Sequence, residues 1–131
     1  MTETDTALAN HLSDCIDRME AIMAQAKPLM TADHPENIAR LKPLRLRMAG
    51  AITSFQVALD RIATDASTSP AKADVAHTSS AAWTMIGNEF RAFALLNQSA
   101  SPQQWEDYLA TGQGFMKRIK AEIQVGRRLF C

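Results

Sequence analysis

The sequence predicts an all-α protein that folds as an antiparallel up-down-up-down four-helix bundle. Apolar residues return every three or four positions through four successive segments, as in helices that bury one face. The chain of 131 residues is 47% hydrophobic and 21% charged and holds only five glycines and five prolines, a composition typical of a helical globule. This length suits a single core. We therefore expect residues 1–131 to form one bundle domain, with helices at roughly 5–30, 34–64, 70–97 and 102–129.

The first segment carries two apolar rows on one broad helical face. The main row alternates steps of four and three and comprises Leu8, Leu12, Cys15, Met19, Ile22, Ala26 and Leu29, and the flanking row comprises Ala9, Ile16, Met23 and Met30. Pro28 lacks an amide hydrogen and clashes with the preceding turn. The helix should therefore kink or end just before this proline.

The second segment has one charged residue in an otherwise apolar row. Asp33 and Glu36 have the spacing of a capping box, and Pro35 falls in the first turn. Pro43 should bend the helix locally. Arg45 is the charged member of the row, which comprises Ile38, Leu41, Arg45, Met48, Ile52, Phe55, Leu59 and Ile62.

The last two segments both begin with serine followed by proline. Ser69 precedes Pro70, and Ser101 precedes Pro102, with Gln104 placed to complete a capping box. Short connections between four helices of similar length favour antiparallel neighbours. The two rows comprise Val75, Ala82, Trp83, Ile86, Phe90, Phe93 and Leu96, and then Trp105, Leu109, Met116, Ile119, Ile123 and Phe130.

Four residues outline a candidate ligand-binding pocket. In an up-down bundle the second helix begins where the third ends, so Arg45 and Glu89 should lie at the same level. The fourth helix starts at that end too, which brings Tyr108 and Gly112 close, and a core-facing glycine leaves space. A small anion or carboxylate would fit, with Arg45 as bidentate donor. In the alternative interpretation, only the aliphatic part of the Arg45 side chain packs against the bundle and its guanidinium lies in water. Glu89 is then a solvated neighbour.

A metal site would need ligands from several helices. His11 and Cys15 lie four residues apart, and His77 should lie at a similar height, where Asp60 or Glu122 would complete four ligands. The chain has three histidines and lacks the repeated carboxylate and histidine ligands of di-iron bundles, such as those of hemerythrin-like proteins. We expect no metal and no cofactor, with surface histidines and a core thiol instead.

The segment from His77 to Gly87 resembles the motif of histidine phosphotransfer domains. In that family an exposed histidine on a four-helix bundle accepts a phosphoryl group, and an apolar residue and a glycine follow nine and ten positions later. Ile86 and Gly87 occupy those positions, whereas the family's lysine and glycine, three and four positions past the histidine, are Ser80 and Ala81 here. The resemblance implies a degenerate phosphotransfer bundle with His77 as phosphoacceptor.

Charge and composition exclude several classes of function. Fourteen basic residues balance fourteen acidic ones, so no net positive field favours nucleic acid. No apolar run approaches the roughly 20 residues of a membrane span, and no nucleophile elbow or glycine-rich phosphate loop occurs. Two basic clusters should form solvated faces or dock an acidic partner: Arg40, Lys42, Arg45 and Arg47, and then Lys117, Arg118, Lys120, Arg127 and Arg128.

We therefore predict a cytoplasmic, non-enzymatic bundle that acts through protein–protein interaction or self-association as an adaptor or regulator. A homodimer would use surplus apolar surface on the first two helices. This surplus comprises the flanking row of the first helix together with Leu44, Leu46, Ala51, Val57 and Ala58. The alternatives are a sensor of a small ligand at the Arg45 pocket and phosphotransfer at His77.

Overall fold

The chain folds into four long α-helices joined by short connections. The computed structural model describes residues 3–99 and 101–130, and the side chains of residues 7–99 and 101–128. The described part contains no strand. The helices are α1 (Glu3–Ala26), α2 (Ile38–Thr64), α3 (Pro70–Leu96) and α4 (Trp105–Phe130), with one-turn 3-10 helices η1 (Lys27–Leu29), η2 (Pro35–Asn37) and η3 (Pro102–Gln104).

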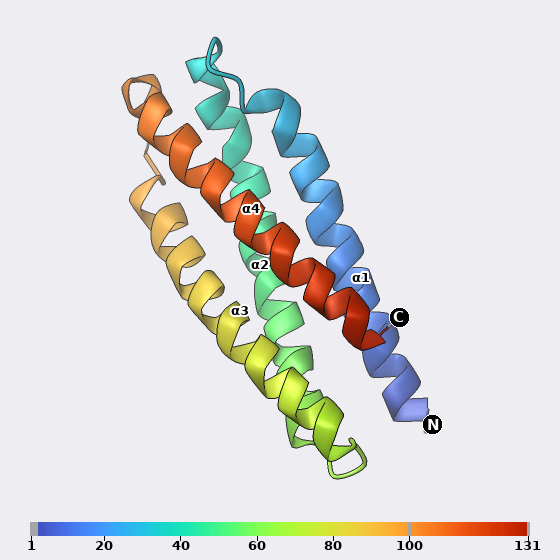
Figure 1. Ribbon diagram of the computed structural model, residues 1–131. Helices are drawn as coiled ribbons and strands as arrows, with labels where there is room; N and C mark the ends of the chain where they lie inside the picture. The colour runs from blue at the N-terminus through green and yellow to red at the C-terminus, as the bar shows by residue number, and fades with distance from the viewer. Residues whose placement is uncertain (1–2, 100, 131) are drawn as a thin grey trace.

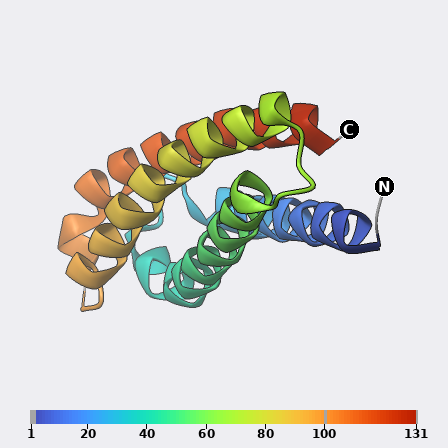
Figure 2. The ribbon, with the colours of Figure 1, turned by 90° about the horizontal axis from the view of Figure 1, so that it is seen from below.

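The helices pack as a two-layer bundle. Each helix runs opposite to the one before it, so α1 begins and α4 ends at the same end of the molecule (Figure 1). One layer holds α1 and α2, and the other holds α3 and α4 (Figure 2). Helix α2 packs extensively against both α1 and α3, whereas α4 contacts α3 and, to a smaller extent, α1. The all-α bundle predicted from the sequence is therefore the observed fold.

Proline and serine set most of the helix ends as predicted. Helix α1 ends at Ala26, just upstream of Pro28, and a single 3-10 turn follows it. The Ser69 hydroxyl accepts a hydrogen bond from the Lys72 amide at 3.3 Å and caps α3. Before α4, the Gln104 side chain accepts from the Ser101 amide at 2.9 Å.

The start of the second helix differs from the prediction. Asp33 makes no cap, because His34 precedes a 3-10 turn and binds Glu36 through a 3.0 Å contact between Nδ1 and Oε1. Buried Asn37 donates to the Leu29 carbonyl at 3.1 Å and fixes this connection. The predicted capping box is thus wrong, and α2 begins only at Ile38.

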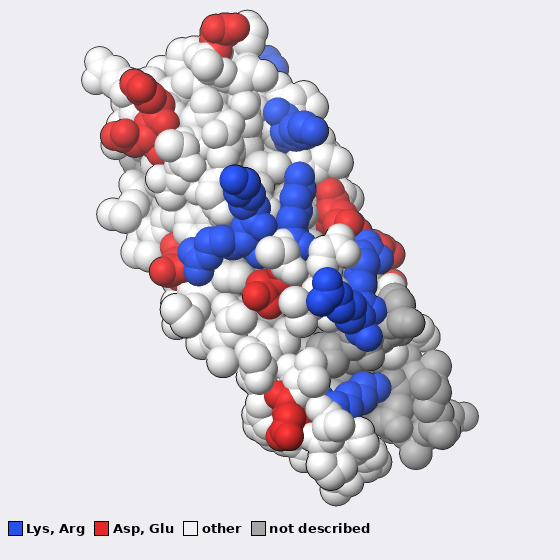
Figure 3. Space-filling model, in the orientation of Figure 1, with Lys and Arg blue, Asp and Glu red and all other residues white. Residues whose placement is uncertain are grey.

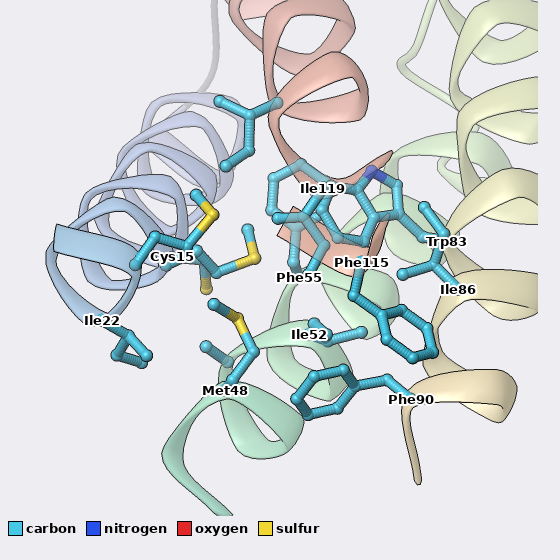
Figure 4. Packing of buried hydrophobic residues seen from close by; sticks show 14 of the residues in the cluster. Cys15, Ile22, Met48, Ile52, Phe55, Trp83, Ile86, Phe90, Phe115 and Ile119 are labelled. Atoms are coloured by element: carbon cyan, nitrogen blue, oxygen red, sulfur yellow. The ribbon is translucent and has the colours of Figure 1, made fainter. Parts of the chain in front are cut away.

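The core is continuous through the four helices and rich in aromatic and sulfur-containing side chains. Side chains from all four helices point toward a common centre (Figure 4). Phe55 and Trp83 pack with ring centroids 4.9 Å apart, and Phe90 packs edge-on against Phe115 at 5.3 Å. Two predicted row members, Val75 and Leu96, are exposed, since they lie near the ends of α3, beyond this core.

Most of the apolar surplus expected at a dimer interface is buried inside the bundle. Ile16 and Met23 of the flanking row are buried, because α1 contacts both α2 and α4. On α2, the surplus residues Leu44, Ala51 and Ala58 are buried as well. Only Leu46, at 62% exposure, and Val57, at 48%, remain on the outer face of α2.

Candidate functional site

Arg45 is buried in the bundle. Helix α2 places it in the same row as Leu41 and Met48, and only 6% of its surface is exposed. Its Nη1 donates to the Tyr108 hydroxyl at 2.6 Å, and its Nη2 donates to the Asn97 carbonyl at 3.0 Å. The guanidinium therefore lies inside the protein, and the alternative of a head group in water is wrong.

These hydrogen bonds connect three helices. Asn97 is the C-cap of α3, where carbonyl groups carry the partial negative charge of the helix end. Tyr108 lies in the first turn of α4 and stacks on Trp105, with ring centroids 5.7 Å apart. A third, longer contact joins Arg45 Nη1 to the Ile38 carbonyl at 3.5 Å, at the start of α2.

Glu89 lies outside this cluster. Its carboxylate is half exposed and pairs with Arg118 Nη1 at 2.5 Å. On α3 the core-facing residues are Phe90 and Phe93, and Glu89 is rotated away from them toward the surface of α4. The prediction of Glu89 in the pocket is thus wrong. Among the described residues, no carboxylate pairs with Arg45.

A small cavity lies beside the buried arginine. Its volume is about 60 Å³, and residues of all four helices line it. Arg45, Tyr108 and Gly112 all form part of its wall. A Cβ at Gly112 would lie 2.9 Å from Met30 Cε, so a larger residue there would push that methionine aside. The structure thus brings together three of the four predicted pocket residues.

The environment of Tyr108 shifts its acidity. Burial raises the pKa of the Tyr108 hydroxyl above its ordinary value, while the hydrogen bond and the positive charge of Arg45 act in the opposite direction. The hydroxyl is protonated at neutral pH, as in any tyrosine, and the raised pKa keeps it protonated to more alkaline pH. This group therefore retains a proton that it can donate to a ligand.

The residues considered for a metal site do not converge. His11 Nε2 lies 3.8 Å from Cys15 Sγ, and burial raises the pKa of this thiol. His77 is exposed on α3, and Asp60 accepts a short hydrogen bond from Ser80. Nowhere in the described chain do three histidine, cysteine or acidic residues approach one another as metal ligands would.

The phosphotransfer-like segment lies on α3. His77 is exposed there, as a phosphoacceptor must be, while Ser80 is buried against Asp60. Gly87 is buried, and a Cβ on it would lie 3.2 Å from the side chains of Gln56 and Arg91. Phosphotransfer at His77 stays a prediction.

The structure reveals a second feature, a basic groove between α1 and α4. It consists of two adjoining hollows: Met23 lines the first, Met30, Met116 and Lys117 line the second, and Lys27 and Lys120 border both. We call these six residues the methionine groove. Basic side chains gather over α4 and its edge toward α1 (Figure 3). The sequence indicated a cluster at Lys117 and Lys120, but nothing in the sequence placed Lys27 beside it.

Comparison with known proteins gives no relative. No family model matches the chain, and neither a curated protein nor a solved structure shows significant similarity to it. Within the described residues, no helix has both the length and the apolar character needed to cross a membrane. Functional proposals therefore depend on the geometry of this chain alone.

Replacing Tyr108 should reveal how strongly it stabilises the buried guanidinium. We expect Tyr108→Phe to lower the free energy of unfolding by about 2 kcal/mol, because a hydrogen bond to a charged group is lost. In an Arg45→Met background the same substitution should cost much less, since no buried charge remains to be satisfied. Urea denaturation of the parent, the two single variants and the double variant gives the coupling energy between Arg45 and Tyr108. Additive effects of the two substitutions would contradict the interaction.

Tyr108 also predicts a pH dependence. It is the only tyrosine in the chain, so tyrosinate absorbance reports its ionisation alone. The folded pKa should lie above the usual value of about 10. The resulting stabilisation is fully present below the unfolded pKa and is lost as the pH rises toward the folded one. In Arg45→Met the folded pKa should rise further, because the nearby cation is gone. An unshifted pKa in both proteins would refute the assigned environment.

Proposed function

We propose that this bundle is a non-enzymatic adaptor that binds an acidic, amphipathic helix of another protein in the methionine groove. The observation that supports the proposal is the combination of an apolar floor with a rim of unpaired positive charge. Helix-in-groove recognition uses this arrangement, with apolar anchors below and charged residues at the edges.

The charges of the rim differ from those around it. Arg118 and Arg127 on α4 are paired with Glu89 and Glu20, respectively. By contrast, Lys27, Lys117 and Lys120 have no ion-pair partner among the described residues. The groove therefore keeps a local positive potential although the whole chain is neutral, and a partner with carboxylates along one face complements it.

The three methionines of the groove suit an apolar helix face. Methionine is unbranched and polarizable, so it adapts to partners of different shape. Met30 and Met116 are partly exposed, whereas Met23 lies deeper. We place the protein in the cytoplasm, where a free thiol such as buried Cys15 stays reduced.

A synthetic helix tests the docking proposal. The probe is a fluorescein-labelled peptide with leucine on one face and glutamate on the other, and its control carries glutamine in place of glutamate. Fluorescence anisotropy should show that the acidic peptide binds and that added salt weakens the binding. The double substitution Lys117→Glu with Lys120→Glu should weaken it by about tenfold or more, because two rim attractions become repulsions.

Matched controls decide the result. Lys42→Glu changes an exposed lysine on α2, outside the groove, and should leave the affinity unchanged. Equal binding of the glutamine peptide, or equal loss with Lys42→Glu, would refute docking in the groove. Displacement of the peptide by phosphatidylserine vesicles would indicate a membrane surface instead.

Self-association is a second candidate function. Leu46 and Val57 project from the same outer face of α2, since eleven residues bring a helix back to nearly the same angle. Two copies could bury these side chains across a twofold axis. We expect light scattering to give a dimer mass for the parent and a monomer mass for Leu46→Glu. A monomeric parent at high micromolar concentration would rule this out.

A further inference from the structure

We infer that the cavity beside Arg45 binds a short-chain aliphatic monocarboxylate, with Arg45 and Tyr108 holding its oxygens. The inference does not rest on docking in the methionine groove, because the observations behind it concern Arg45 and Tyr108 inside the bundle. It starts from a buried positive charge for which the described chain supplies no counter-ion.

Some N–H groups of Arg45 have no acceptor among the described residues. A guanidinium carries five N–H groups, and the structure gives this one three hydrogen bonds, to Tyr108, Asn97 and, at 3.5 Å, Ile38. All three acceptors are uncharged, so the positive charge is only partly compensated. A carboxylate is the acceptor whose geometry and charge match the remaining N–H groups.

Tyr108 supplies a second donor at the same place. Its hydroxyl oxygen accepts from Arg45 at 2.6 Å, and among the described residues nothing accepts the hydroxyl proton. Arg45 and Tyr108 both line the cavity, so both side chains border the space in which a ligand would lie. This pair of donors is a more specific recognition element than a lone arginine.

The rest of the cavity wall determines what the remainder of the ligand, beyond its carboxylate, can be. Every other lining residue is apolar or glycine, including Ile22, Leu41, Phe93 and Gly112. A phosphate or sulfate would leave some of its oxygens against hydrocarbon, which is costly. A monocarboxylate puts both oxygens at the donors and its alkyl chain against the apolar wall.

The size of the cavity limits the length of the chain. A volume of about 60 Å³ admits only a few water-sized molecules, so the ligand is small. Met23, Met30 and Met116 line both the cavity and the methionine groove above it. Rotation of these unbranched side chains can enlarge the space and widen its access to solvent, which suits acids of about two to four carbons.

Propionate is the probe for the test. Calorimetric titration should show saturable binding of propionate to the parent, and none of propionamide or inorganic phosphate at equal ionic strength. Arg45→Met should weaken propionate binding by about tenfold or more, since hydrogen bonds to a charged group are lost. The matched control Arg47→Met removes an exposed arginine two residues further along α2 and should leave the affinity unchanged.

A second measurement needs no variant and keeps the inference testable if Arg45→Met does not fold. Bound propionate neutralises Arg45, so the tyrosinate titration of the parent should move to higher pH in propionate and stay unchanged in propionamide. No binding of propionate by the parent would overturn the inference. Equal binding of propionamide or phosphate, or equal affinity in Arg45→Met, would overturn it as well.

Discussion

A positive charge buried without a carboxylate constrains this bundle more than any other feature. Arg45 can remain inside only while the chain keeps hydrogen-bond acceptors around it, and these come from the end of α3 and the start of α4. Hydrogen bonds as well as packing therefore hold the end of α3 and the start of α4 against α2. Withdrawing one acceptor would leave a desolvated cation, whose cost exceeds that of an ordinary lost contact.

The other end of the bundle depends on shape. There Phe55 packs on Trp83, and Gly126 lets α4 come close, since a Cβ at that glycine would lie 3.2 Å from Phe55 Cζ. Two buried polar atoms, Ser79 Oγ and Trp83 Nε1, have no hydrogen-bond partner in the described part of the chain. Close packing thus outweighs polar satisfaction at this end, whereas polar satisfaction dominates around Arg45.

The sequence predicted most of the fold because the relevant signals are local. Proline and capping serines mark where helices begin and end, and the apolar period marks which face is buried. The period also identified Arg45, the one charged residue in its row. It failed for Glu89, because adjacent positions on a helix differ by about 100° and the period alone cannot say on which flank a polar residue turns outward.

Features that depend on tertiary packing could not be predicted. Lys27 and Lys120 border the same groove only because α1, with η1 at its end, lies beside α4, and no local pattern encodes that approach. The cavity has the same origin, since it is the space left by side chains of four helices. The predicted cap at Asp33 failed because a single 3-10 turn with its own contacts replaced the first turn of α2.

The modest contact between α1 and α4 has a consequence for exchange between the interior and solvent. Sub-global opening favours loosely packed seams, and the α1–α4 seam holds methionines that line both the groove and the cavity. A helix seated in the groove would clamp the seam and slow the escape of a molecule held inside. If the proposed helix and the proposed carboxylate both bind, the occupancy of the groove and the residence time of the carboxylate in the cavity would be coupled.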